Sequence, residues 1–108
     1  MCGILGSINR TFGLSELDLI SHRGPDDFGL ETLIVNNNKI ILAQRRLSIL
    51  DLSPAGHQPM FSKCENYCLI FNGEIYNHIE LRKRLPKNIA FNGHSDTETI
   101  LHYIINFG

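Results

Sequence analysis

Residues 31–44, ETLIVNNNKIILAQ, restrict the possible folds more than any other part of the sequence. Two runs rich in β-branched residues flank three consecutive asparagines at positions 36–38. β-branched residues favour strands, and asparagine tolerates the left-handed backbone conformation that a tight hairpin turn requires. The segment therefore predicts a β-hairpin.

Other segments predict two more strands and three helices. Apolar runs predict buried strands at residues 2–8 and 67–71, the second covered on both faces. A Ser or Asn that precedes Asp or Glu by three positions is a helix-start pattern. This pattern predicts helices over residues 15–22, 77–85 and 95–106.

The order of these elements predicts the fold class. Pro86 ends the second helix. The third helix presents one apolar stripe, which consists of Ile100, Leu101, Ile104 and Ile105. Strands followed by helices predict a layered α+β fold. A length of 108 residues fits one domain over residues 1–108.

Composition excludes several classes of partner. A net charge of −1 gives no electrostatic basis for binding nucleic acid or an anionic membrane. No apolar run reaches the ~18 residues of a membrane span, and the N-terminus lacks a secretory signal pattern. The odd number of cysteines, three, argues against a disulfide framework. Together these features predict a cytoplasmic protein with reduced thiols.

Cys2 has two interpretations. Free cysteine usually behaves as a small buried hydrophobe. Alternatively, removal of Met1 makes Cys2 an N-terminal nucleophile. An α-amino group has an ordinary pKa of about 7.7–8.0, so a fraction is neutral near pH 7 and can accept the thiol proton. A cysteine in this position would carry its own general base, and it would need none of the five histidines.

Other residues match the remaining needs of acyl transfer. Asn72 and Gly73 follow the predicted strand at 67–71. Their side-chain amide and backbone N–H could stabilise an oxyanion, although Asn-Gly is also a common turn dipeptide. Arg46 could bind a carboxylate with its planar guanidinium. Asp96 and Glu74 could face an ammonium group. The alternative for these charges is a solvated surface or, for Asp96, a helix cap.

A metal site is a further interpretation, because Cys64 and Cys68 follow His57. In an extended strand, residues four apart share a face but lie about 13 Å apart, too far for one zinc ion. Cys68 also falls inside an apolar run, which predicts a core position. The sequence therefore predicts no metal site.

Five motifs, taken in order, resemble one family. They are MCGILG at the N-terminus, SHRGPDDFG at 21–29, RRLSILDLSPAGHQP at 45–59, FNGEIYNHIELR at 71–82 and HSDTE at 94–98. Together they are similar to the glutaminase domain of the class II, N-terminal nucleophile glutamine amidotransferases. The most similar branch is that of the asparagine synthetases. The resemblance extends over nearly the whole chain.

The resemblance implies a role for each candidate residue in the hydrolysis of glutamine to glutamate and ammonia. Cys2 is the implied nucleophile, which forms a thioester. Asn72 and Gly73 form the implied oxyanion hole.

The resemblance also implies how glutamine is bound. Arg46 is implied to bind its carboxylate, and Asp96 and Glu74 its α-amino group. The implied pocket lining is the backbone of Leu47, Ser48, Ile49 and Leu50. The implied wall near the nucleophile is the loop that contains Arg23, Gly24 and Asp26.

The implied fold is the αββα sandwich of N-terminal nucleophile hydrolases, of which we expect only part in this sequence. The glutaminase reaction is expected to need no cofactor. The expected partners are glutamine and a synthetase domain that receives the ammonia and uses ATP and Mg²⁺, and a homo-oligomer is possible. An alternative is a non-catalytic fragment that binds a partner chain through open sheet edges.

Overall fold

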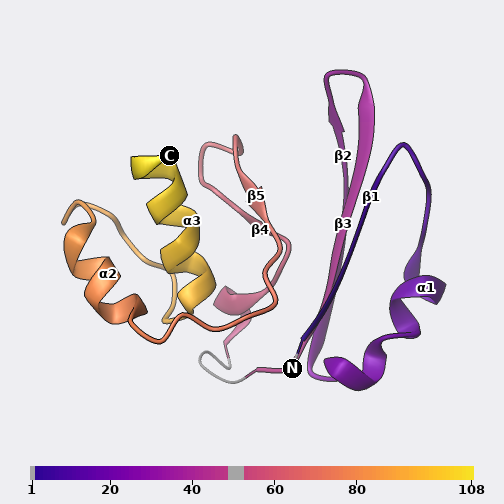
Figure 1. The fold of residues 1–108 in the computed structure, drawn as a ribbon, viewed down its shortest axis with the longest axis horizontal. Helices are drawn as coiled ribbons and strands as arrows, with labels where there is room; N and C mark the ends of the chain where they lie inside the picture. Colours follow the sequence, from indigo (N-terminus) through magenta and orange to yellow (C-terminus); the bar gives the residue numbers. More distant parts are fainter. Residues whose placement is uncertain (1, 49–52) are drawn as a thin grey trace.

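The computed structural model describes residues 2–48 and 53–108. These residues form two parts that lie side by side (Figure 1). The sheet part, residues 2–48, contains a three-stranded antiparallel sheet, and the helical part, residues 53–108, contains two helices and a short two-stranded sheet. The described residues therefore form a small mixed α/β domain.

The predicted hairpin is confirmed and is longer than the pattern that revealed it. Strand β2 (Asp27–Val35) pairs with β3 (Asn38–Arg46), and Val35 opposes Asn38 next to the turn. Asn36 and Asn37 form the turn with positive φ angles of 50° and 65°. A two-residue turn matches the twist of its two strands when both residues adopt the left-handed conformation, and asparagine tolerates that conformation.

Strand β1 (Gly3–Ile8) pairs with the other side of β3, so the strand order is β1-β3-β2. Side chains alternate between the two faces of a sheet, and directly opposed residues share a face. Gln44 opposes Ile4, so these two side chains share a face with Arg46. That face is turned toward the helical part, because Gln44 Nε2 donates to Phe71 O at 3.0 Å.

The opposite face of the sheet carries the apolar core of the sheet part. Helix α1 (Leu14–Asp18) and the 3-10 helix η1 (Ser21–Arg23) cover this face. Leu17, Ile41 and Ala43 are almost fully buried. The predicted start of α1 is wrong: Ser15 lies inside the helix, because the Glu16 carboxylate accepts from Gly13 N at 2.8 Å and begins the helix earlier.

The helical part has little regular sheet. Strands β4 (Met60–Phe61) and β5 (Cys68–Leu69) pair with each other over two residues each. The prediction of a fully buried strand at 67–71 is wrong. Tyr67 is 39% exposed and Cys68 and Leu69 are half-buried, because among the described residues β5 has one neighbouring strand instead of a position inside a larger sheet.

Helices α2 (His78–Arg84) and α3 (Asp96–Phe107) pack against each other. Ser95 caps α3 as predicted, because its Oγ accepts from Glu98 N at 3.2 Å. Asn77 occupies the N-cap position of α2 as predicted, although its side chain makes no capping hydrogen bond. The apolar stripe of α3 is only partly covered, since Leu101 is buried and Ile104 is 41% exposed. None of the described helices is long and apolar enough to cross a bilayer.

Candidate functional site

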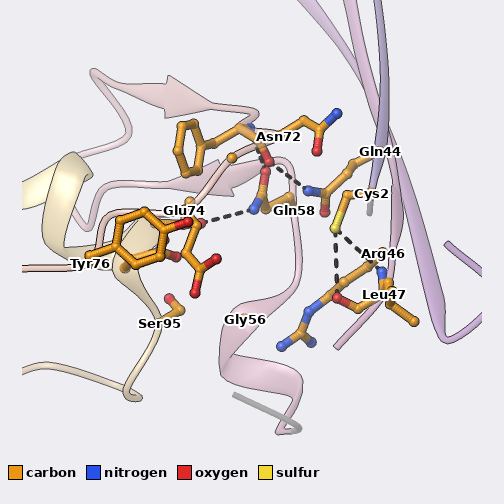
Figure 2. A pocket seen from close by; sticks show the side chains of 14 residues that line it. Cys2, Gln44, Arg46, Leu47, Gly56, Gln58, Asn72, Glu74, Tyr76 and Ser95 are labelled. Atoms are coloured by element: carbon orange, nitrogen blue, oxygen red, sulfur yellow. Dashed lines mark hydrogen bonds between the residues drawn. The ribbon is translucent and has the colours of Figure 1, made fainter. Parts of the chain in front are cut away.

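A pocket of about 340 Å³ lies where the sheet part meets the helical part. This volume suits a small-molecule ligand. Figure 2 shows side chains from both parts converging on it. It is lined by Cys2, Gln44, Arg46, Leu47, Gly56, Gln58, Phe71, Asn72, Gly73, Glu74, Tyr76, Ser95, Asp96 and Thr97.

Cys2 enters the pocket from the start of β1. Its Sγ accepts a hydrogen bond from Leu47 N at 3.3 Å and donates to Leu47 O at 3.7 Å. Its own carbonyl accepts from Arg23 Nε at 3.2 Å. The thiol is half-buried, so it is held in place and still reachable from the pocket.

Arg46, at the end of β3, is buried and also lines the pocket. Its Nη1 donates to Ser53 O at 3.0 Å. The guanidinium lies so close to the backbone of Gly56 that a Cβ on residue 56 would overlap with it. The 3-10 helix η2 (Pro54–Gly56) therefore needs glycine at its last position for Arg46 to keep this orientation.

The loop at residues 23–26 supports this side of the pocket. The backbone of Gly24 lies against the peptide between Arg45 and Arg46, where a Cβ would collide. Asp26 N donates to Arg46 O at 3.0 Å, and its carboxylate accepts from Ser48 N at 2.8 Å. Ser48 thus lies beside Asp26 in a neighbouring hollow. Ile49 and Leu50 lie outside the described residues.

The helical part brings Asn72, Gly73 and Glu74 to the opposite side of the pocket. The buried side chains of Gln44 and Gln58 hold Phe71, the residue that precedes Asn72. Phe71 O accepts from Gln44 Nε2 at 3.0 Å, and Phe71 N donates to Gln58 Oε1 at 2.7 Å. This double contact ties the Asn72 segment to both parts of the molecule.

Gln44 and Gln58 were missed by the sequence analysis. Their amide side chains carry no charge and match none of the expected chemistry. The sequence could have indicated Gln44 by its position, because it is a polar residue within an apolar strand and lies on the same face as Arg46.

Asp96 is held at the first turn of α3, where it is 6% exposed. Its carboxylate accepts from Ile75 N at 2.8 Å, which links α3 to the segment that carries Glu74. Asp96 therefore reaches the pocket as a buried side chain with a fixed orientation. Asp96 is therefore neither a solvated surface charge nor a helix-capping side chain, the two alternatives that the sequence left open.

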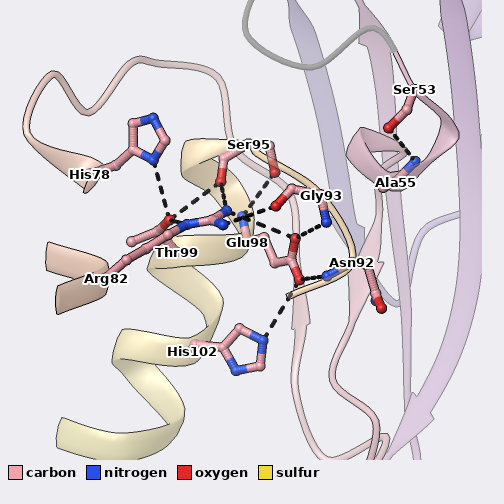
Figure 3. Close-up of polar contacts among 10 residues, drawn as sticks. All are labelled: Ser53, Ala55, His78, Arg82, Asn92, Gly93, Ser95, Glu98, Thr99 and His102. Carbon is pink, nitrogen blue, oxygen red and sulfur yellow. Dashed lines mark hydrogen bonds and ion pairs between the residues drawn. The ribbon is translucent and has the colours of Figure 1, made fainter. Parts of the chain in front are cut away.

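A buried polar network behind Asp96 fixes the start of α3 (Figure 3). The Glu98 carboxylate accepts from Asn92 N at 2.7 Å and from Gly93 N at 2.9 Å. Arg82 donates to Thr99 Oγ1 at 2.8 Å and to the carbonyls of Gly93 and Ser95, each at 2.9 Å. The network positions the residues that precede Asp96 through charge-assisted hydrogen bonds.

Three other titratable residues lie away from the pocket. His57 Nδ1 lies 2.6 Å from an Asp27 carboxylate oxygen. Cys64 is exposed, and hydrogen bonds from Ser62 and then from the Asn66 backbone lower the pKa of its thiol. Burial raises the pKa of the Cys68 thiol. In the described part of the chain, no three His, Cys, Asp or Glu side chains cluster closely enough to hold a metal ion.

The pocket thus combines a thiol, an amide segment, a guanidinium and a buried carboxylate. Such a set can hold the carboxylate and ammonium of an amino acid while a thiol reacts with its side chain.

Comparisons with known proteins identify close relatives. Asparagine synthetase (glutamine-hydrolysing) 1 of Bacillus subtilis (strain 168) is 42% identical over 112 residues, which cover 94% of this chain and 17% of the relative. The protein of the same name from Arabidopsis thaliana is 40% identical over 118 residues, with 100% and 19% covered. Amidase chry2 of Gibberella zeae is 37% identical over 97 residues, with 86% and 14% covered. The chain spans less than a fifth of the length of these three relatives.

A family model described as a glutamine amidotransferase domain matches residues 1–108. The match covers the whole sequence and includes all the residues that line the pocket. We conclude that the chain belongs to the glutamine amidotransferase domain family.

Proposed function

We propose that this chain is the glutaminase part of an asparagine synthetase-like amidotransferase, and that it hydrolyses glutamine to glutamate and ammonia in the pocket described above. One observation carries the proposal: the thiol of Cys2 shares a pocket with Asn72, Gly73, Arg46 and Asp96. The names of the relatives, which are glutamine-hydrolysing, agree with this substrate.

In the proposed reaction, Met1 is removed and the α-amine of Cys2 takes the thiol proton. The sulfur attacks the side-chain carbonyl carbon of glutamine, and the carbonyl oxygen becomes an oxyanion. The Asn72 amide and the Gly73 N–H donate hydrogen bonds to that oxygen. As the intermediate collapses, the C–N bond breaks and the amine returns its proton to the leaving ammonia. Water then hydrolyses the thioester to glutamate.

The α-groups of the substrate are proposed to bind at the other end of the pocket. Arg46 pairs with the carboxylate, because a guanidinium matches a carboxylate with two parallel hydrogen bonds. Asp96 and Glu74 supply the negative charge for the ammonium group. Leu47, which also lines the pocket, completes the lining in this proposal.

We also propose a setting in a larger cytoplasmic assembly. Ammonia would pass to a synthetase domain that holds ATP and Mg²⁺ and uses aspartate as the default acceptor. The sheets would form part of an αββα sandwich. In support, Ile4 and Ile8 project from the sheet face that carries Gln44, and they are 42% and 66% exposed.

A second candidate is a non-catalytic chain that binds a partner. The supporting observation is that β1 and β2 are both edge strands of the three-stranded sheet. Exposed edges can pair with another chain or with a second copy of this one. Sedimentation of the purified chain would detect self-association.

The decisive test is labelling of Cys2 by a diazoketone analogue of glutamine, followed by peptide mass spectrometry. We expect stoichiometric labelling of Cys2 in the chain that lacks Met1, and glutamate release that Cys2→Ala abolishes. Cys64→Ala and Cys68→Ser are the matched controls, because both thiols lie outside the pocket, and both should retain activity. Labelling of Cys64 with Cys2 untouched, or full activity in Cys2→Ala, would contradict the proposal.

A further inference from the structure

One polar atom in the pocket wall is buried without a protein partner. Gln44 is 1% exposed, and its Oε1 receives no hydrogen bond from the part of the chain that the structure describes. Burying an amide oxygen without a donor is unfavourable, and such atoms are rare in folded proteins. Gln44 lines the pocket, so this oxygen belongs to the pocket wall, beside the space that a ligand would fill.

The orientation of the Gln44 amide is determined by its other end. Nε2 donates to Phe71 O at 3.0 Å. A flipped amide would place its oxygen against that carbonyl, so two acceptors would face each other. The group that Gln44 presents to the pocket is therefore an acceptor.

Gln44 lies at the Cys2 end of the pocket. Gln44 opposes Ile4 in the β1–β3 pair, and Cys2 is two residues before Ile4, so both side chains project from the same face of the sheet. Figure 2 shows the side chains of Gln44 and Cys2 coming from the sheet on the same side of the pocket. The acceptor thus lies on the side of the pocket from which Cys2 would attack in the proposed reaction.

The side chain of glutamine has one oxygen acceptor and two N–H donors on its amide group. In the proposed function, Asn72 and Gly73 donate to the oxygen. Before the thiol transfers its proton, the nearby carbonyl of Leu47 accepts from the Cys2 thiol. We propose that Gln44 Oε1 accepts a hydrogen bond from the amide N–H of bound glutamine, an inference that rests on the proposed function.

This contact selects amides over other acyl groups. The carboxylate of glutamate and the ester of L-glutamate γ-methyl ester have no N–H to donate. Either group would leave Gln44 Oε1 unpaired or facing another acceptor. Gln44 would therefore favour the substrate over its product and over ester analogues.

The test compares glutamine with L-glutamate γ-methyl ester in the chain without Met1, by single-turnover glutamate release at stoichiometric protein concentration. We expect Gln44→Met to lower the ratio of amide to ester kcat/KM about 5- to 10-fold, the usual effect of one neutral hydrogen bond. Gln58→Met is the matched control. Both ends of Gln58 bind protein, to Phe71 N and Thr97 Oγ1, so its variant should slow both substrates equally.

If folded Gln44→Met keeps the same amide-to-ester ratio, the inference is wrong. If the unsubstituted chain shows no Cys2-dependent hydrolysis of glutamine, the proposed function is wrong instead. If Gln44→Met does not fold, calorimetry on Cys2→Ala decides the inference. Glutamine should bind that variant several-fold more tightly than the ester, and equal affinities would contradict the contact.

Discussion

The two sides of the pocket are held together in different ways. In the sheet part, β3 is hydrogen-bonded to a strand on each side along most of its length, and the register places Arg46 beside the start of β1. In the helical part, β4 and β5 are two residues long, and the segment before Asp96 is held by the side chains of Arg82 and Glu98. Backbone pairing supports one side, and buried charged groups support the other.

Two arginines illustrate the difference. Arg45, in the sheet part, donates to Gly24 O at 2.9 Å, lies 3.9 Å from the exposed carboxylate of Asp18 and stands 5.5 Å from the centre of the Phe28 ring. Arg82, in the helical part, donates to Thr99 Oγ1 and to the carbonyls of Gly93 and Ser95, and its guanidinium lies 3.9 Å from the centre of the Phe91 ring. Removing a single side chain should therefore disturb the helical side of the pocket more than the sheet side.

Asn72→Ala should have the largest effect among the predictions that compare the two sides. It removes a donor that the helical part contributes to the proposed oxyanion hole, which typically lowers kcat about 10²- to 10³-fold. KM should change less, because the ground-state carbonyl carries less charge than the oxyanion. Steady-state glutamate release measures both constants. Asn88→Ala, at an exposed position outside the pocket, is the control. A higher KM with unchanged kcat would make Asn72 a binding residue.

Arg82→Met should lower the free energy of unfolding by about 3 kcal/mol, because it removes three charge-assisted hydrogen bonds and leaves buried acceptors without donors. Arg45→Met is the matched control, and its expected loss is about 1 kcal/mol because the strand ladder remains. Urea denaturation of both variants measures the difference. Equal losses would show that the two sides depend on their arginines to the same degree.

Gly56→Ala should raise the KM for glutamine about tenfold with a smaller change in kcat. The new methyl group overlaps with the guanidinium of Arg46, which has to move from its place in the pocket. Gly6→Ala is a matched control on the sheet side, since its nearest neighbour would be Leu42 at 3.6 Å, an ordinary contact. Comparable KM values for the two variants would argue against the binding role of Arg46.

The smallest expected effect is a pH dependence of stability in the helical part. Burial lowers the pKa of His102 below its usual value of 6.5, although the Glu98 carboxylate acts in the opposite direction. The unfolded chain therefore binds a proton more readily than the folded one, so His102 reduces stability as the pH falls below about 6.5. Thermal melting of the chain and of His102→Gln between pH 7.5 and 5.5 should show a shallower decline for the variant. Parallel declines would exclude this contribution.

Several features of this protein could be predicted from sequence because neighbouring residues determine them. The hairpin forms around Asn36 and Asn37, whose side chains tolerate the left-handed turn, and Ser95 caps the helix that begins beside it. The order of the five motifs was enough to indicate the amidotransferase family, which the family model confirms. The wrong prediction at Ser15 concerns a capping group whose hydroxyl instead donates to Glu16, the residue that begins the helix earlier by accepting from Gly13 N.

The tertiary structure alone decided how the pocket is held together. The sequence predicted Cys2, Arg46, Asn72 and Asp96 as chemical groups, but their convergence depends on packing between segments far apart in the chain. The supporting contacts of Gln44, Gln58, Arg82 and Glu98 could not be predicted from the sequence, because an amide or a charge acquires its partners only in the packed chain. A local pattern can determine a turn or a cap, whereas a hydrogen bond such as that from Gln44 to Phe71 forms only when the whole chain has packed.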